Sequence, residues 1–144
     1  MGRSDLRGRT VRTPFVNGYL LDTSIALHAI TYPERISVHA RHAVERGPVF
    51  LSILSYWEVV VKSMKGKVEV RDPRTWWPDA LGQLGASILP LRPDHIGEIA
   101  DLPLLHKDPF DRALIAQARV ERLVLVTTDG LIAKYADSRL RVLG

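Results

Sequence analysis

The sequence contains no cysteine among its 144 residues. This absence excludes disulfide bonds, cysteine-ligated zinc sites and a thiol nucleophile, and it is compatible with a reducing cytosol. Long apolar runs are missing as well. No stretch approaches the roughly 18 apolar residues that a membrane-spanning helix needs, and no apolar signal-peptide core follows the first methionine. We therefore expect a cytoplasmic protein without a membrane partner.

The composition that remains is that of an ordinary globular protein, with 46% hydrophobic and 25% charged residues. This length predicts one domain with a substantial core. The formal net charge of +4 fits either a mildly basic protein or one that binds a polyanion such as nucleic acid. Charge alone does not decide between these two interpretations.

Residues 1–17 contain four arginines and few apolar side chains. We expect this segment to be a flexible basic arm and residues 18–144 to form a single domain. The arm would either contact a nucleic-acid backbone or be an extension without a role.

Short apolar segments alternate with segments of helical periodicity along the rest of the chain. This alternation predicts an α/β sandwich with a mostly parallel sheet. The expected strands are residues 18–22, 49–53, 87–91, 123–126 and 140–143. The expected helices pass through residues 25–30, 35–46, 56–64, 73–84, 94–101, 109–118 and 131–135.

Acidic residues follow the predicted strands or begin the predicted helices. Asp22 and Asp129 each come directly after a strand, and Asp111, with Asp108 beside it, lies at a helix start. Glu58 stands near a helix start that follows another strand. Because the carboxyl ends of parallel strands meet at one edge of a sheet, these acids can converge there.

Each acid also has a purely structural explanation as a helix cap. Asp108 precedes Pro109 and is the natural N-cap of its helix. Thr23 or Ser24 is expected to cap the helix after Asp22. Ser55 is expected to cap the next helix, with Glu58 completing a capping box.

Clustered carboxylates repel one another, and a hard divalent cation such as Mg²⁺ or Mn²⁺ removes that repulsion. One or two such ions can activate a water and stabilise a displacement at phosphorus. Lys62 and Lys65 share the helix face of Glu58 at positions i+4 and i+7. Such a face suits phosphate binding.

Four motifs occur in a familiar order. They are Leu20-Leu-Asp-Thr-Ser24, Leu51-Ser-Ile-Leu-Ser-Tyr-Trp-Glu58, His106-Lys-Asp-Pro-Phe-Asp-Arg-Ala-Leu-Ile-Ala-Gln-Ala118 and Leu123-Val-Leu-Val-Thr-Thr-Asp129. With these motifs the chain resembles a PIN-domain ribonuclease, specifically the VapC-type toxin of a VapBC toxin–antitoxin pair. The likeness spans nearly the whole chain apart from the basic arm.

The resemblance implies a PIN-like three-layer α/β/α sandwich and an Mg²⁺- or Mn²⁺-dependent endoribonuclease. It implies that the catalytic acids are Asp22, Glu58, Asp111 and Asp129. The metal ligands would be Asp22, Asp111 and Asp129, with Asp108 as an auxiliary acid or the helix cap. Residues expected to orient these acids or to contact the RNA are Thr23, Ser24, Thr127, Lys62, Lys65 and Arg112.

The resemblance also implies a homodimer and a cognate VapB-like antitoxin that covers the acidic groove. Thr128 stands where many relatives have a basic residue, which puts a phosphate-binding role at that position in doubt. His106 would contact substrate or have a structural role.

Three other functions remain open. The first is a non-catalytic module that binds nucleic acid or a protein partner. The second is a structure-specific DNA nuclease with the same fold. The third is a phosphatase with Asp22 as covalent nucleophile. We rank it low, because Ser24 occupies the position where such enzymes usually have a second aspartate.

Overall fold

The computed structural model describes residues 3–4, 10–11 and 17–144. Within the first 16 residues, the short strands β1 (Arg3–Ser4) and β2 (Thr10–Val11) pair antiparallel. The expected flexibility of the rest of the basic arm lies outside the described residues.

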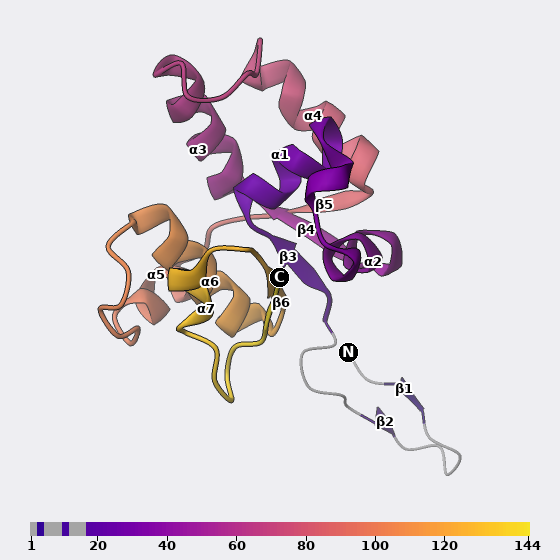
Figure 1. The fold of residues 1–144 in the computed structure, drawn as a ribbon. Coiled ribbons are helices and arrows are strands. Elements are labelled where there is room, and N and C mark those ends of the chain that lie inside the picture. Colours follow the sequence, from indigo (N-terminus) through magenta and orange to yellow (C-terminus); the bar gives the residue numbers. More distant parts are fainter. Residues whose placement is uncertain (1–2, 5–9, 12–16) are drawn as a thin grey trace.

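The central sheet has five strands, all parallel, in the spatial order β5-β4-β3-β6-β7. The first strand of the domain therefore lies at the centre of the sheet (Figure 1). This arrangement confirms the predicted mostly parallel α/β fold. The strands are β3 (Tyr19–Leu21), β4 (Val49–Ser52), β5 (Ala86–Leu89), β6 (Val124–Val126) and β7 (Val142–Leu143).

Helices connect the strands and cover the sheet, and none in the described part of the chain is long and apolar enough to cross a membrane. Helix α3 contacts both α4 and α6. The helices are α1 (Thr23–Thr31), the 3₁₀ turn η1 (Pro33–Arg35), α2 (Val38–Arg46), α3 (Ile53–Met64), α4 (Pro73–Leu84), α5 (Pro93–Ile99), α6 (Pro109–Glu121) and α7 (Gly130–Ala133).

Successive side chains of the central strand enter different cores, as the two-residue period of a strand requires. Leu20 packs in the core that α5, α6 and α7 share, whereas Leu21 packs in the core beneath α1, α2 and α4. Figure 1 shows the same division, with α5, α6 and α7 on one side of the sheet and α1 and α4 on the other. The three layers predicted from the resemblance are therefore present.

Gly18 lets the central strand begin close to its neighbour. Its φ of +134° lies in the region that favours glycine, and a Cβ there would be 2.7 Å from the carbonyl oxygen of Pro48. The next residue, Tyr19, donates its N–H to that same oxygen at 2.9 Å. The register of β3 beside β4 depends on this close approach.

Candidate metal centre

The chain reverses direction across the sheet at its central strand. From β3 it crosses first to β4 and β5, and only later to β6 and β7 on the other side. In parallel sheets, ligands bind at the carboxyl edge where two crossovers diverge in this way. Asp22 follows β3 directly and donates its N–H to the Val126 carbonyl of β6 at 3.0 Å. Asp22 therefore lies at this switch point.

Asp22 is buried, and both of its carboxylate oxygens have donors. Its Oδ1 accepts the Ser24 N–H at 2.6 Å, and its Oδ2 accepts the Thr127 hydroxyl. Asp22 is thus itself the N-cap of α1, so the expected capping by Thr23 or Ser24 was wrong. Burial raises the pKa of Asp22, while the hydrogen bonds from Thr127 and Ser24 partly oppose that shift.

Asp129 caps the next helix in the same manner, since its Oδ1 accepts the Leu131 N–H of α7 at 2.8 Å. The Asp129 N–H donates to the Thr127 hydroxyl oxygen at 3.0 Å. One threonine hydroxyl therefore bonds to Asp22 and to the backbone of Asp129. Thr127 is therefore better placed to orient the acids than to donate to a phosphate.

The start of α6 brings two more carboxylates to the edge. Asp108 is the N-cap, as predicted, and its Oδ1 accepts the N–H groups of Phe110 and Asp111 at 2.8 and 3.2 Å. Asp111 lies in the first turn. Burial, followed by repulsion from Asp108, Glu58 and Asp22, raises the pKa of Asp111 to about 7.

Glu58 lies deeper in its helix than the sequence indicated. Helix α3 begins at Ile53 and is capped by Ser52, whose Oγ accepts the Leu54 N–H at 3.0 Å. Ser55 is therefore a buried residue within the helix, and the expected capping box with Glu58 was wrong. Glu58 is itself buried and pairs with Lys62 at 3.0 Å. Its capping explanation is thereby removed.

Five carboxylates from different segments line one cavity of about 260 Å³. A larger cavity of about 540 Å³ lies between α1 and α4, and none of these acids lines it. The residues around the acidic cavity, which we call the acidic pocket, are Asp22, Thr23, Ser24, Glu58, Lys62, Asp108, Asp111, Thr128 and Asp129.

Three of the predicted site residues do not line the acidic pocket. Thr127 lies behind Asp22, and Lys65 is the exposed C-cap of α3. Arg112 instead donates to the carbonyl oxygens of Pro103 and Ile99 at 3.0 and 3.2 Å. Its guanidinium therefore holds the segment before α6.

Comparison with known proteins identifies the family of this chain. The sequence model of the PIN domain matches residues 19–138, which is most of the chain. This chain belongs to the PIN-domain family. No curated protein matches it closely enough in sequence to count as a relative.

Solved structures of toxin–antitoxin complexes share the PIN fold of this chain. The VapBC2 complex of Rickettsia felis, bound to a promoter DNA fragment, aligns with TM-score 0.63 at 14% identity, covering 88% of this chain and 98% of the other. A toxin–antitoxin complex from Klebsiella pneumoniae aligns with TM-score 0.58 at 20% identity, covering 88% and 97%. DNA-bound VapBC of Salmonella typhimurium aligns with TM-score 0.59 at 14% identity, covering 87% and 96%. At these identities the likeness concerns the fold.

The carboxylates of this PIN domain suit a hard divalent cation. Oxygen ligands are what Mg²⁺ and Mn²⁺ prefer. The raised pKa values of Asp22 and Asp111 mean that the chain alone does not stabilise the full negative charge of the cluster. A bound cation would offset this repulsion, so the residues present fit the metal that the family implies.

His106 joins these acids, although the sequence left its role open. Its Nε2 lies 2.8 Å from Asp111 Oδ2 and 3.6 Å from Asp129 Oδ2. The ligand atoms of the three residues all lie within 4.8 Å of one another. No local spacing rule links His106 to Asp129, because they meet only when β6 and the segment before α6 reach the same edge.

Proposed function

We propose that this protein is an Mg²⁺- or Mn²⁺-dependent endoribonuclease that hydrolyses phosphodiester bonds in RNA. The observation that carries the proposal is the acidic pocket at the switch point of the sheet, where five carboxylates converge in a PIN domain. Carboxylates gathered at such an edge suit phosphoryl transfer, because the metal ions they bind stabilise charge on the phosphate.

Asp22, Asp111 and Asp129 would hold the metal, with Asp108 as an auxiliary ligand. When bound, the ion supplies an activated water and stabilises the charge that develops at phosphorus. Glu58 would bind a second ion or orient the attacking water from the α3 side of the pocket. Asp108 is better suited to the auxiliary role than Asp111, because its Oδ1 already accepts two backbone N–H groups.

Cationic and hydroxyl side chains would guide the RNA backbone to the acids. Lys62 lines the pocket beside Glu58, and Lys65 is exposed at the end of the same helix. Ser24 is an exposed residue of the pocket lining and would meet a phosphate oxygen there. The hydroxyl of Thr23 donates to Ser55 at 2.9 Å, which favours an orienting role for Thr23.

A cleavage assay with a fluorescent single-stranded RNA tests this function. We expect cutting with Mg²⁺ or Mn²⁺, none with a chelator, and loss of cutting in Asp22→Asn while circular dichroism is unchanged. Asp79→Asn is the matched control, because Asp79 lies outside the acidic pocket. Full activity of Asp22→Asn would refute the mechanism.

The same assay separates the alternatives. A DNA nuclease would cut a DNA strand or a structured duplex in preference to RNA. A non-catalytic module would bind nucleic acid with no metal-dependent product. We favour RNA because the four sequence motifs resemble ribonuclease toxins of this size.

We further propose that the chain is the toxin of a VapBC-type pair and works in the cytoplasm. Its structural neighbours are toxin–antitoxin complexes, which supports a VapB-like partner. Such a partner would cover the acidic pocket and offset its negative charge with a basic side chain. Adding the small protein encoded beside this gene should abolish RNA cleavage, and a stable 1:1 complex should appear in gel filtration.

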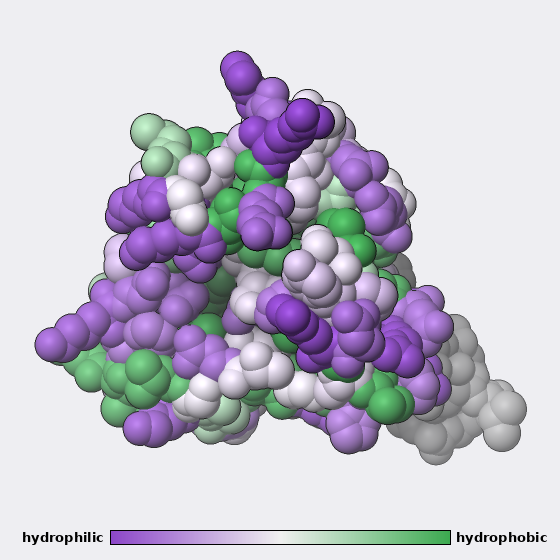
Figure 2. Space-filling model, turned by 45° about the horizontal axis from the view of Figure 1, so that its top comes forward, coloured by the Kyte–Doolittle hydropathy of each residue, from purple (hydrophilic) through white to green (hydrophobic). Residues whose placement is uncertain are grey.

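A homodimer is the assembly we propose for the free toxin. One face of α3 exposes Ile53, Trp57 and Met64, which are 37%, 60% and 83% accessible, and Trp57 contacts Phe110 of α6 edge-to-face at 5.0 Å. Apolar groups also reach the surface on the side of the molecule drawn in Figure 2. Light scattering should give twice the monomer mass, and Met64→Glu should reduce it to that of one chain.

A further inference from the structure

His106 is held by two segments that are far apart in the sequence. Its backbone N–H donates to the Tyr135 hydroxyl at 2.9 Å, and that hydroxyl donates to the Pro103 carbonyl at 2.8 Å. Arg112 reaches the same hydroxyl at 3.2 Å and the Pro103 carbonyl at 3.0 Å. The segment that carries His106 is therefore fixed by side chains of α6 and of the residues after α7.

The imidazole of His106 has one defined hydrogen-bonding state. Its Nδ1 accepts the backbone N–H of Asp108 at 3.2 Å. A nitrogen that accepts this hydrogen bond carries no proton, so the proton of the neutral ring is on Nε2. With its proton in place, Nε2 has no lone pair for a metal, and His106 is a donor toward the acids.

The Nε2–H of His106 lies between two carboxylates. It is 2.8 Å from Asp111 Oδ2 and 3.6 Å from Asp129 Oδ2, and it is aligned for a hydrogen bond with neither oxygen alone. Among the described residues, no donor reaches Asp111 Oδ1. The Nε2 atom of His106 is therefore within contact distance of one oxygen of each acid, and the second oxygen of Asp111 has no donor among the described residues.

From this geometry we propose that His106 is a positioning residue, whose Nε2–H orients the carboxylates of Asp111 and Asp129 for the divalent cation. The proposal rests on the metal-dependent function proposed above and assigns His106 a place behind the ligands rather than among them. Hydrogen bonds to ligating carboxylates fix their orientation, and their loss typically weakens metal binding about 10–100-fold.

A second histidine, His95, has similar contacts to those of His106 but lies away from the acidic pocket. His95 accepts the Arg92 N–H at Nδ1 at 3.0 Å, and its Nε2 lies 2.7 Å from Glu121 Oε2. The Nδ1 of His95 thus accepts a backbone N–H as in His106, and its Nε2 also contacts a carboxylate, but His95, Arg92 and Glu121 do not line the pocket. A substitution at His95 therefore controls for the loss of a buried histidine.

Calorimetric titration of the full chain with Mn²⁺ alone tests the proposal. We expect His106→Ala to weaken Mn²⁺ binding about tenfold or more. We expect His106→Gln to recover most of that affinity, because the amide N–H of glutamine reaches a similar position. His95→Gln should lower Tm and leave the Mn²⁺ affinity unchanged.

Two results would overturn the positioning role while leaving the proposed function intact. The first is a His106→Ala variant that binds Mn²⁺ with wild-type affinity. The second is a His106→Gln variant that binds Mn²⁺ as weakly as His106→Ala does, because the ring nitrogen itself would then be a metal ligand. A wild-type chain that binds no Mn²⁺ would instead overturn the proposed function and this inference together. Asp111→Asn should abolish binding in every case where the site is real.

Nuclear magnetic resonance of the ¹⁵N-labelled rings gives a readout that does not depend on folding of a variant. The His106 ring of the wild-type chain should show an unprotonated Nδ1 and a protonated Nε2, before and after addition of diamagnetic Mg²⁺. A proton on Nδ1, or loss of the Nε2 proton when Mg²⁺ binds, would contradict the proposal.

Discussion

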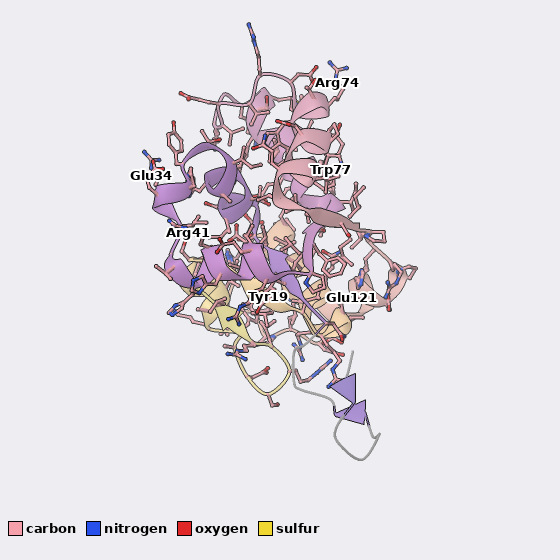
Figure 3. The ribbon with its side chains drawn as sticks, turned by 90° about the vertical axis from the view of Figure 1, so that its right-hand side faces the viewer. Tyr19, Glu34, Arg41, Arg74, Trp77 and Glu121 are labelled. Atoms are coloured by element: carbon pink, nitrogen blue, oxygen red, sulfur yellow. The ribbon has the colours of Figure 1, made fainter. Side chains whose placement is uncertain are left out.

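The two ends of helix α6 carry the same arrangement of a histidine and a carboxylate. At the N-terminal end His106 pairs with Asp111, and at the C-terminal end His95 pairs with Glu121. The ends lie about 20 Å apart, since the helix has 13 residues and each rises about 1.5 Å. In Figure 3 Glu121 lies near the level of Tyr19, where β3 begins, so this pair is at the amino edge of the sheet.

The difference between the two ends is the source of positive charge. Arg92 contacts Glu121 at 2.5 Å and Asp94 at 2.8 Å, so the C-terminal pair is neutralised by the chain itself. At the other end, Lys62 is the cationic side chain among the described residues of the pocket lining, and it pairs with Glu58. The N-terminal end therefore has more carboxylates than cationic side chains, which supports the proposal that it binds a cation from outside.

Removing one carboxylate at each end should produce the largest contrast. Asp111→Asn should reduce metal-dependent RNA cleavage about 100-fold or more, because it removes a proposed metal ligand. Glu121→Gln should lower Tm and leave the cleavage rate within a factor of about two, because Glu121 lies outside the acidic pocket. Initial cleavage rates and melting curves of both variants measure these effects. Equal cleavage rates in the two variants would contradict the proposed difference between the two ends of α6.

The pH dependence of stability should differ between metal-free and metal-bound protein. Because the folded-state pKa of Asp111 is raised to about 7 from 3.8, the folded chain keeps a proton that the unfolded chain releases. This stabilisation is fully present below pH 3.8 and is lost as the pH rises through about 7. The raised pKa of Asp22 acts in the same direction.

We therefore expect Tm in a chelator to fall across this window and Mn²⁺ to restore it near neutral pH. Melting curves at a series of pH values, with and without Mn²⁺, measure both trends. The slope should be smaller in Asp111→Asn and unchanged in Glu121→Gln. A metal-free Tm that stays constant between pH 4 and 7 would contradict the assignment of the pKa to Asp111.

Tyr135→Phe should weaken the N-terminal end of α6 through the segment that holds His106. The substitution leaves the N–H groups of Leu105 and His106 without their acceptor, which costs about 1–3 kcal/mol of unfolding free energy. We expect Mn²⁺ affinity to fall as well, though less than in His106→Ala. Chemical denaturation and calorimetry measure the two effects, and a loss of stability with unchanged Mn²⁺ affinity would uncouple Tyr135 from the site.

Arg92→Gln should have the smallest effect, because the guanidinium is solvent-exposed. It removes the positive charge that faces Asp94 and Glu121, so Tm should fall by less than in Tyr135→Phe. Metal affinity should not change. A new Mn²⁺ site at the C-terminal end in Arg92→Gln would strengthen the comparison of the two ends of α6. It would show that Mn²⁺ from solution can replace the positive charge of Arg92.

Most of the fold could be predicted because its signals are local. Asp108 before Pro109 predicts an N-cap, and the structure confirms it. The predicted boundary at α3 was wrong by three residues, because an apolar run such as Leu51 to Leu54 looks the same as strand or helix. The N-cap of α3 is Ser52, whereas the sequence pattern favours Ser55.

The acids could be predicted as a group, since the four aspartates follow a strand or begin a helix near one edge and Glu58 lies in the helix that follows β4. Their partners could not be predicted from spacing. Thr127 bonds to Asp22 from a position 105 residues away in the sequence, and Tyr135 fixes His106 from a position 29 residues away. Arg112, which the resemblance assigned to RNA, is turned toward backbone carbonyls by this same packing.

The sequence by itself predicted that these acids gather at the carboxyl edge, because a parallel sheet brings the ends of its strands and the starts of the following helices to one edge. Only the tertiary structure decided how those acids are held. Two histidines with similar local surroundings differ because Arg92 neutralises the carboxylate of one, whereas the other faces Asp111 and Asp129. That difference depends on contacts between distant segments, which no local pattern in the sequence encodes.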